Sequence, residues 1–152
     1  MSTAQSQIIG TQLVERFKRF YADIRQLPLD DIESLYHPDV VFKDPVHSLR
    51  GSHCLHAYMS DVCSGVSEGR FEYLDQVIGL DSAYIKWNMH FVHPRLGDQL
   101  ISVRGMSQIK FCDRIHYHED VYDMGAMLYE HLPLIGGATR WLRHNLVKKS
   151  QQ

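Results

Sequence analysis

The chain has 152 residues, of which 44% are hydrophobic and 22% are charged, and its formal net charge is −2. These values are typical of one globular domain with one hydrophobic core. A net charge of −2 does not predict the strongly basic surface with which proteins bind nucleic acid. No segment reaches the ~20 apolar residues of a membrane span.

Helices are predicted for the N-terminal part of the chain. Apolar residues recur at three- and four-residue steps over residues 9–27, which predicts one amphipathic helix that ends at Pro28. The segment LDDIESLYHPD, residues 29–39, predicts a second, short helix that stops at His37, before Pro38.

A strand and a third helix come next. The segment VVFKD, residues 40–44, predicts a strand that ends on a carboxylate, Asp44. The third helix is expected to begin after Gly51, with Ser52 as its N-cap. Its buried face is expected to carry Leu55, Tyr58, Met59 and Val62.

Four long strands are predicted from residue 70 onward, where the hydrophobic period changes to two. Only short breaks separate them, so neighbouring strands are expected to pair as antiparallel hairpins or a meander. The predicted strands are residues 70–80, 83–93, 99–111 and 114–123.

This order of elements predicts the fold class. Helices gathered before a run of strands are typical of α+β proteins, in which the helices cover one face of a curved antiparallel sheet and form a cone with an apolar interior. We expect a single domain over residues 1–152, with a core of about 8–123 and a C-terminal extension over 124–152. Residues 138–149 predict a short basic helix, which either lies on a membrane or partner, or packs on the sheet or a dimer seam, the arrangement we favour.

The strand at residues 83–93 has two distinct faces. Ile85, Trp87, Met89 and Phe91 share the face expected to form core or cavity wall, and Tyr84, Lys86, Asn88 and His90 share the outer face. Large aromatic residues on an inner face mostly indicate packing, so ligand stacking by Trp87 is the second interpretation.

The segment HYHED, residues 116–120, allows two interpretations. His116, His118 and Asp120 alternate, so a regular strand would place all three on one face, where they could hold zinc or iron. A solvated outer face is favoured, because no fourth ligand is identifiable by spacing. We therefore expect no metal and no cofactor.

The first residues and the cysteines indicate the cellular compartment in which the protein is expected. The first residues, MSTAQSQIIG, have no basic region and no long apolar run, which argues against a signal peptide. Cys54, Cys63 and Cys112 form an odd, widely spaced set, which suggests neither a disulfide framework nor a zinc site. A cytoplasmic protein is the resulting expectation.

Two segments carry a resemblance to a known family. The helix–strand–DP segment SLYHPDVVFKDPVHSLRG, residues 34–51, and the last-strand segment IHYHEDVYD, residues 115–123, resemble the nuclear transport factor 2-like superfamily. Within it, the chain is most similar to SnoaL-like proteins and ketosteroid isomerases. The resemblance covers about residues 8–123 and implies a cone-shaped α+β fold.

The resemblance also implies two candidate acids. In ketosteroid isomerases the aspartate of the matching DPV turn is the general base, which would direct Asp44 into the cavity. That reaction also needs a tyrosine and a second acid, which correspond to Phe17, with Tyr21 one turn on, and to Ser107, so steroid isomerisation is not expected. In SnoaL-like cyclases the working acid lies at the position of Asp120.

The residues alone leave the orientation of these acids open. Asp44 either faces a cavity or caps the turn that follows it, and His47 either shares the cavity mouth or lies in solvent. Asp120 and Ile115 can both face inward only if the last strand contains a β-bulge between Tyr117 and Val121.

Two functions follow from this sequence. One is a SnoaL-like enzyme that binds a small apolar molecule and uses Asp120, ahead of Asp44, in metal-free acid/base chemistry of the isomerase, cyclase or dehydratase type. The other is a non-catalytic ligand-binding or dimeric interaction module, and a homodimer through the outer sheet face is expected in either case. The expected ligand-binding residues are Trp87, Met89, Phe91, Ser107, His47, Tyr21, Tyr58 and His118.

Overall fold

The N-terminal apolar stripe forms helix α1 (Thr3–Phe20), which begins and ends earlier than the helix predicted over residues 9–27. The chain turns after Phe20 and makes a separate 3-10 turn, η1 (Ile24–Gln26). Asp23 caps this turn, because its carboxylate accepts a hydrogen bond of 3.0 Å from the amide of Arg25. The local cap thus breaks the stripe into two elements that both reach the core.

Short elements lead into the sheet. They are η2 (Leu29–Asp31), α2 (Ile32–Leu35), strand β1 (Tyr36–Lys43) and strand β2 (Ser48–Arg50). The helix predicted to reach His37 is therefore too long, and Pro38 lies inside a strand. Strand β2 was not predicted, because three residues are too few to show a period.

Helix α3 (Ser52–Gly65) begins after Gly51, whose φ of 96° is a conformation that favours glycine. The prediction that Ser52 is the N-cap is wrong, since Gly51 occupies that position. The hydroxyl of Ser52 instead donates a hydrogen bond of 2.9 Å to Glu33, which ties α3 to α2.

The last four strands match the predicted segments closely, and the short elements η3 and α4 follow β4 and β6. Their bounds are β3 (Glu68–Ile78), β4 (Ser82–Val92), η3 (Pro94–Leu96), β5 (Ile101–Phe111), β6 (Ile115–Tyr122) and α4 (Met124–Met127). The sheet order is β2-β1-β6-β5-β4-β3. The sheet is mixed, because β1 runs parallel to β6 while every other neighbouring pair is antiparallel.

The computed structural model describes residues 2–127, 140, 141 and 144. Most of the basic helix predicted at residues 138–149 therefore lies outside the described residues. None of the helices in the described part could cross a membrane.

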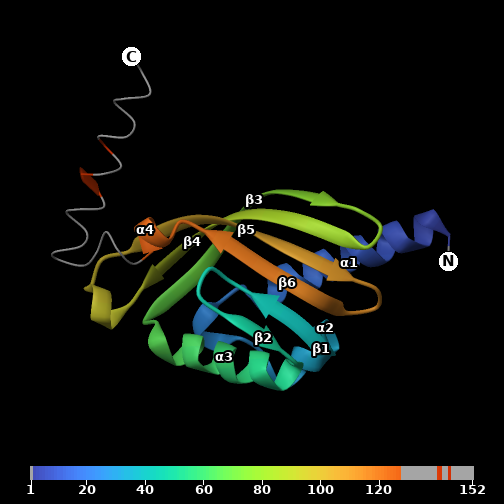
Figure 1. Ribbon diagram of the computed structural model, residues 1–152, viewed down its shortest axis with the longest axis horizontal. Helices are drawn as coiled ribbons and strands as arrows, with labels where there is room; N and C mark the ends of the chain where they lie inside the picture. Colours follow the sequence, from blue (N-terminus) through green and yellow to red (C-terminus); the bar gives the residue numbers. More distant parts are fainter. Residues whose placement is uncertain (1, 128–139, 142–143, 145–152) are drawn as a thin grey trace, which may run out of the picture.

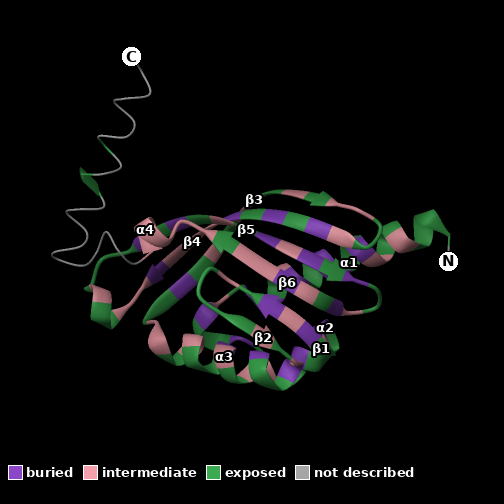
Figure 2. Cartoon of the chain, in the orientation of Figure 1, coloured by how far each residue is buried: buried purple, intermediate pink, exposed green. Residues whose placement is uncertain are grey.

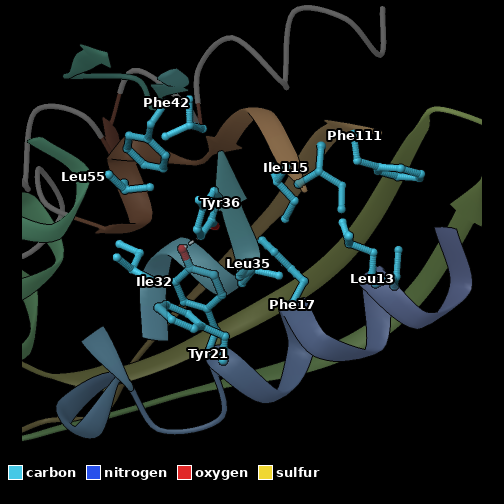
Figure 3. Close-up of a cluster of buried hydrophobic side chains, with 14 of the residues drawn as sticks. Leu13, Phe17, Tyr21, Ile32, Leu35, Tyr36, Phe42, Leu55, Phe111 and Ile115 are labelled. Atoms are coloured by element: carbon cyan, nitrogen blue, oxygen red, sulfur yellow. Dashed lines mark hydrogen bonds between the residues drawn. The ribbon is translucent and has the colours of Figure 1, made fainter. Parts of the chain in front are cut away.

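Helices and sheet enclose one main core. Figure 1 shows α1 running behind the curved sheet and α3 lying along the β1–β2 edge. Buried and exposed residues alternate along the strands (Figure 2). In Figure 3, Leu13 and Phe17 of α1 point toward Leu35, Phe111 and Ile115. Part of the inner face of the sheet lies outside this packed core and lines a cavity.

Strand β4 has the two faces that its alternation predicts. Trp87 and Phe91 are buried, and Tyr84 and Lys86 are exposed. The pairing of Trp87 with Gly105 on β5 fixes this register.

Candidate functional site

A cavity of about 360 Å³ lies between α3, the 21–27 segment and the inner faces of β1, β4 and β6. Its volume falls in the range of sites for small ligands. Eight residues expected from the sequence line it: Tyr21, Asp44, His47, Tyr58, Trp87, Met89, Phe91 and Asp120. Two expected residues, Ser107 and His118, lie behind this lining.

A β-bulge in β6 decides which residues enter the cavity. Ile115 pairs with Phe111 and Tyr117 pairs with Lys110, so His116 is the extra residue between them. The bulge therefore lies just before the predicted segment, but it reverses the faces in the expected way.

The bulge separates the two histidines of the HYHED segment. His116 is exposed, whereas His118 is 1% exposed. The favoured interpretation of both as solvated outer-face residues is thus wrong for His118. No cluster of three potential metal ligands occurs among the described residues.

His118 forms one of two arms that hold Asp120. Its Nε2 lies 2.8 Å from Oδ1 of Asp120, and a carboxylate only accepts, so Nε2 donates. The imidazole is enclosed by aromatic rings: Phe17 and Phe42 meet it edge-on and Tyr36 stacks on it. This enclosure fixes the orientation of the ring.

Two tyrosines extend the histidine arm into the core. The Tyr36 hydroxyl lies 2.9 Å from Nδ1 of His118 and 2.7 Å from the Tyr21 hydroxyl. Figure 3 shows Tyr21 and Tyr36 side by side. Burial raises the pKa of both tyrosines well above the ordinary value, so both keep their protons and can donate.

Ser107 and Trp87 form the second arm. The Ser107 hydroxyl donates to Oδ1 of Asp120, and the indole Nε1 of Trp87 donates to Ser107 over 2.9 Å. Oδ1 therefore accepts from both arms. Oδ2 of Asp120 accepts from no side chain or amide among the described residues, and the side chain, 18% exposed, faces the cavity.

Asp44 both lines the cavity and caps its turn. Its Oδ1 accepts from the amides of Val46 (2.7 Å) and His47 (2.6 Å), and its Oδ2 accepts from the Tyr58 hydroxyl (2.6 Å). Burial alone would raise the pKa of Asp44, but these hydrogen bonds and one from the His47 ring outweigh burial and lower its pKa. A carboxylate with both oxygens occupied and a lowered pKa is a weak base.

Tyr122 also lines the cavity, although it was not predicted from the sequence. It follows Asp120 by two residues, so alternation from Asp120 places it on the same face. No described residue forms a hydrogen bond with its hydroxyl. Burial, followed by the charges of Asp44 and Asp120, raises its pKa, so it remains a hydrogen-bond donor.

Residues 17–118, more than half of the chain, match the SnoaL-like domain. The chain belongs to the SnoaL-like domain family. The match ends two residues before Asp120, so the position of Asp120 in this SnoaL-like protein comes from the geometry described above.

Solved structures share the fold of this SnoaL-like protein. A candidate SnoaL-like polyketide cyclase from Shewanella denitrificans has a TM-score of 0.68 and 19% identity, covering 78% of this chain and 93% of its own. A protein with a ketosteroid isomerase-like fold from Catenulispora acidiphila, in complex with trimethylamine, has a TM-score of 0.67 and 10% identity, covering 77% of this chain and 89% of its own. TerC, co-crystallised with polyporic acid, has a TM-score of 0.67 and 14% identity over 78% and 95%.

A search of curated proteins found no match. Because the identities to the solved structures are low, these likenesses establish the fold and not the reaction. The nuclear transport factor 2-like fold expected from the sequence is confirmed.

Proposed function

We propose that this protein binds a small, largely apolar molecule in the cavity and exchanges a proton with it through Oδ2 of Asp120. The observation that carries the proposal is the asymmetry of that carboxylate: two arms hold Oδ1, and Oδ2 has no partner among the described residues. A fixed carboxylate oxygen in an apolar cavity is suited to general acid/base catalysis. The reaction type is an isomerisation, cyclisation or dehydration that needs no metal.

Asp120 is preferred to Asp44 because their surroundings differ. Both oxygens of Asp44 already accept hydrogen bonds from the turn and from Tyr58. Its role in the proposed site is to hold the cavity wall in shape and to add negative charge there.

Tyr122 supplies the group that such chemistry needs beside a base. Abstraction of a proton next to a carbonyl leaves negative charge on the carbonyl oxygen, and a hydrogen-bond donor stabilises that charge. The Cα atoms of Asp120 and Tyr122 are roughly 7 Å apart by strand geometry. One flat ligand therefore spans both groups.

The second candidate function is a ligand-binding module without catalysis. Two hydrogen bonds favour this function. The Tyr21 hydroxyl is bonded to Tyr36 and the Ser107 hydroxyl to Asp120, so neither hydroxyl is available to stabilise a reacting oxygen. The ligands held by TerC and by the Catenulispora protein support a small-molecule site in either case.

Hydrogen–deuterium exchange of 2-tetralone tests the two candidates against each other. This apolar bicyclic ketone has acidic C–H bonds next to its carbonyl. Asp120 would take the proton, the C–H electron pair would move to the carbonyl oxygen, and a deuteron from D₂O would return to carbon. NMR measures the exchange rate with the wild-type protein, with Asp120→Asn, and with Asp113→Asn, an exposed aspartate outside the cavity.

The expected result is acceleration by the wild type and by Asp113→Asn, and a loss of about a hundredfold in Asp120→Asn. Equal rates for wild type and Asp120→Asn would remove Asp120 from the mechanism. If 2-tetralone binds without acceleration, the protein is the ligand-binding module.

We also propose a cytoplasmic homodimer. All three cysteines are free thiols, which suits a reducing compartment. The outer sheet face carries exposed Tyr84, Met106 and Val121, and a second copy would cover this face by two-fold symmetry.

A further inference from the structure

Trp87 is placed to do more than fill the cavity wall. It is 2% exposed, and its indole N–H donates to Ser107. An indole N–H can donate but never accept. The Ser107 oxygen must therefore accept from Trp87, and the only hydroxyl proton of Ser107 is left to donate to Asp120.

The neighbouring strand is built to hold the indole in this position. Gly105 pairs with Trp87 across β4 and β5. A Cβ atom at position 105 would lie 2.2 Å from Cη2 of Trp87, so any other residue would displace the ring. Phe71 meets the indole edge-on with ring centroids 5.0 Å apart. The ring thus lies across the backbone of β5 and cannot turn its N–H away.

The chain of donors crosses three strands. Trp87 is on β4, Ser107 is on β5, and Ser107 pairs directly with Asp120 on β6. Hydrogen bonds in such a buried series strengthen one another, because each donor is polarised by the one behind it. Removing the first donor should therefore weaken the bond at the far end.

We propose that Trp87 and Ser107 are positioning residues, which aim Oδ2 of Asp120 into the cavity and weaken its hold on a proton. This inference deepens the proposed function and rests on it for its catalytic meaning. Trp87 acts only through Ser107, and Ser107 acts by donating to the charged form of the carboxylate, which stabilises that form.

The direct test follows the carboxyl carbon of Asp120 by ¹³C NMR over a pH series, in the full chain and without ligand. Asp120→Asn assigns the signal. In Ser107→Ala the pH at the midpoint of the Asp120 titration should rise by about one unit, which is the scale of one hydrogen bond to a charged group. In Trp87→Phe it should move in the same direction by less.

The double variant makes the test specific. Trp87→Phe/Ser107→Ala should match Ser107→Ala alone, because the hydrogen bond donated by Trp87 reaches Asp120 through Ser107. Ser107→Thr keeps a hydroxyl and should restore the wild-type midpoint. Trp141→Phe, at the other tryptophan, is the matched control and should change nothing.

Other titratable groups around Asp120 remain in place in all these variants. They are His118 and Tyr122 on β6, Tyr36 on β1, Asp44 in the turn after β1, Tyr58 on α3, Tyr21 after α1 and Tyr73 on β3. A midpoint shift confined to the Trp87 and Ser107 variants therefore reports the donor chain.

A second substitution removes the donor without changing the packing. Benzothienylalanine replaces the indole N–H with sulfur at nearly the same volume, and it can be introduced at position 87 in a Trp141→Phe background. It should reproduce the shift of Trp87→Phe. In Ser107→Ala the indole N–H proton of Trp87 should also move upfield, since its acceptor is gone.

The outcomes separate this inference from the proposed function. If the midpoints shift as stated but the wild type does not accelerate 2-tetralone exchange, the proposed catalysis fails and the donor chain stands. If the shifts of Trp87→Phe and Ser107→Ala add, or if benzothienylalanine leaves the midpoint unchanged, the inference is wrong whatever the protein catalyses.

Discussion

Nε2 of His118 lies 2.8 Å from Oδ1 of Asp120, and the two residues share the inner face of β6 only because His116 bulges out of the strand. The same contact leaves Oδ2 toward the cavity. The position of the candidate acid is therefore a property of the backbone as much as of the side chain.

His118→Phe should destabilise the fold by about 2 kcal/mol or more, since it removes one buried hydrogen bond from the Tyr36 hydroxyl and one from the Asp120 carboxylate. Urea unfolding measures the change. His116→Phe, two residues away and exposed, is the control and should stay within about 0.5 kcal/mol. Equal effects of the two substitutions would contradict the inward position of His118.

Asp44→Asn should destabilise the protein in a pH-dependent way. The folded pKa of Asp44 is lowered, because the hydrogen bonds it accepts outweigh burial, while the unfolded value is about 3.9. Its carboxylate therefore stabilises the fold above about pH 3.9, and this contribution is lost as pH falls through the lowered folded pKa. Urea unfolding at pH 3 to 7 should show the gap between wild type and variant narrowing toward acid; a gap that stays constant would count against this view.

Gly105→Ala should cost about 2 kcal/mol or more, because its Cβ would overlap the ring of Trp87. Gly65→Ala is the matched control: its Cβ would lie 3.5 Å from His93, which is ordinary contact, and it sits at the end of a helix. Thermal unfolding of both variants provides the comparison. Near-equal melting temperatures would mean that the indole has room to move.

The strands of this protein were predictable because their signal is local. Alternation alone places Trp87 inside and Tyr84 outside on β4, and the short breaks between strands specify hairpins. The parallel pairing of β1 with β6 has no local signal, since the two strands are far apart in sequence. The periodicity also gives no sign of the break in the first apolar stripe, where Asp23 caps the separate turn η1.

The site was predictable only in part. The inward position of Asp120 was expected from family resemblance, whereas strict alternation from Ile115 places it in solvent. The bulge at His116 depends on how β6 pairs with β5, and the residues of β6 alone do not determine that pairing. The link from Trp87 through Ser107 depends on side-chain rotamers across three strands and on the space at Gly105.

Ligand charge should matter strongly in this cavity. Its lining includes Asp44, Asp61 and Asp120 and no lysine or arginine among the described residues. We expect 2-naphthoate to bind about tenfold or more weakly than 2-naphthol, because an anion meets like charge in a site of low dielectric. Calorimetry measures both affinities. Equal binding would place these ligands outside the cavity.

Assembly can be tested on the outer sheet face. Light scattering should give twice the chain mass of 17.7 kDa for the wild type. Met106→Glu/Val121→Glu puts charge on two neighbouring exposed positions of this face and should give the single-chain mass. Val46→Glu, equally apolar and exposed but in the turn after β1, should remain dimeric. A wild type of 17.7 kDa would refute the homodimer.

The extra residue at His116 determines which residues of β6 face the cavity. Deleting it would give a regular strand in which Tyr117, His118 and Asp120 keep their partners on β5, so Asp120 would stay on the inner side. Adding one residue between Tyr117 and His118 would instead exchange the faces that follow, so that Glu119 would take the inner side and Asp120 the outer. A carboxylate would still point inward, but one carbon longer and without the arms of Ser107 and His118. Gain of a single residue is thus a short evolutionary route by which this scaffold could alter or abandon a reaction while keeping its sheet.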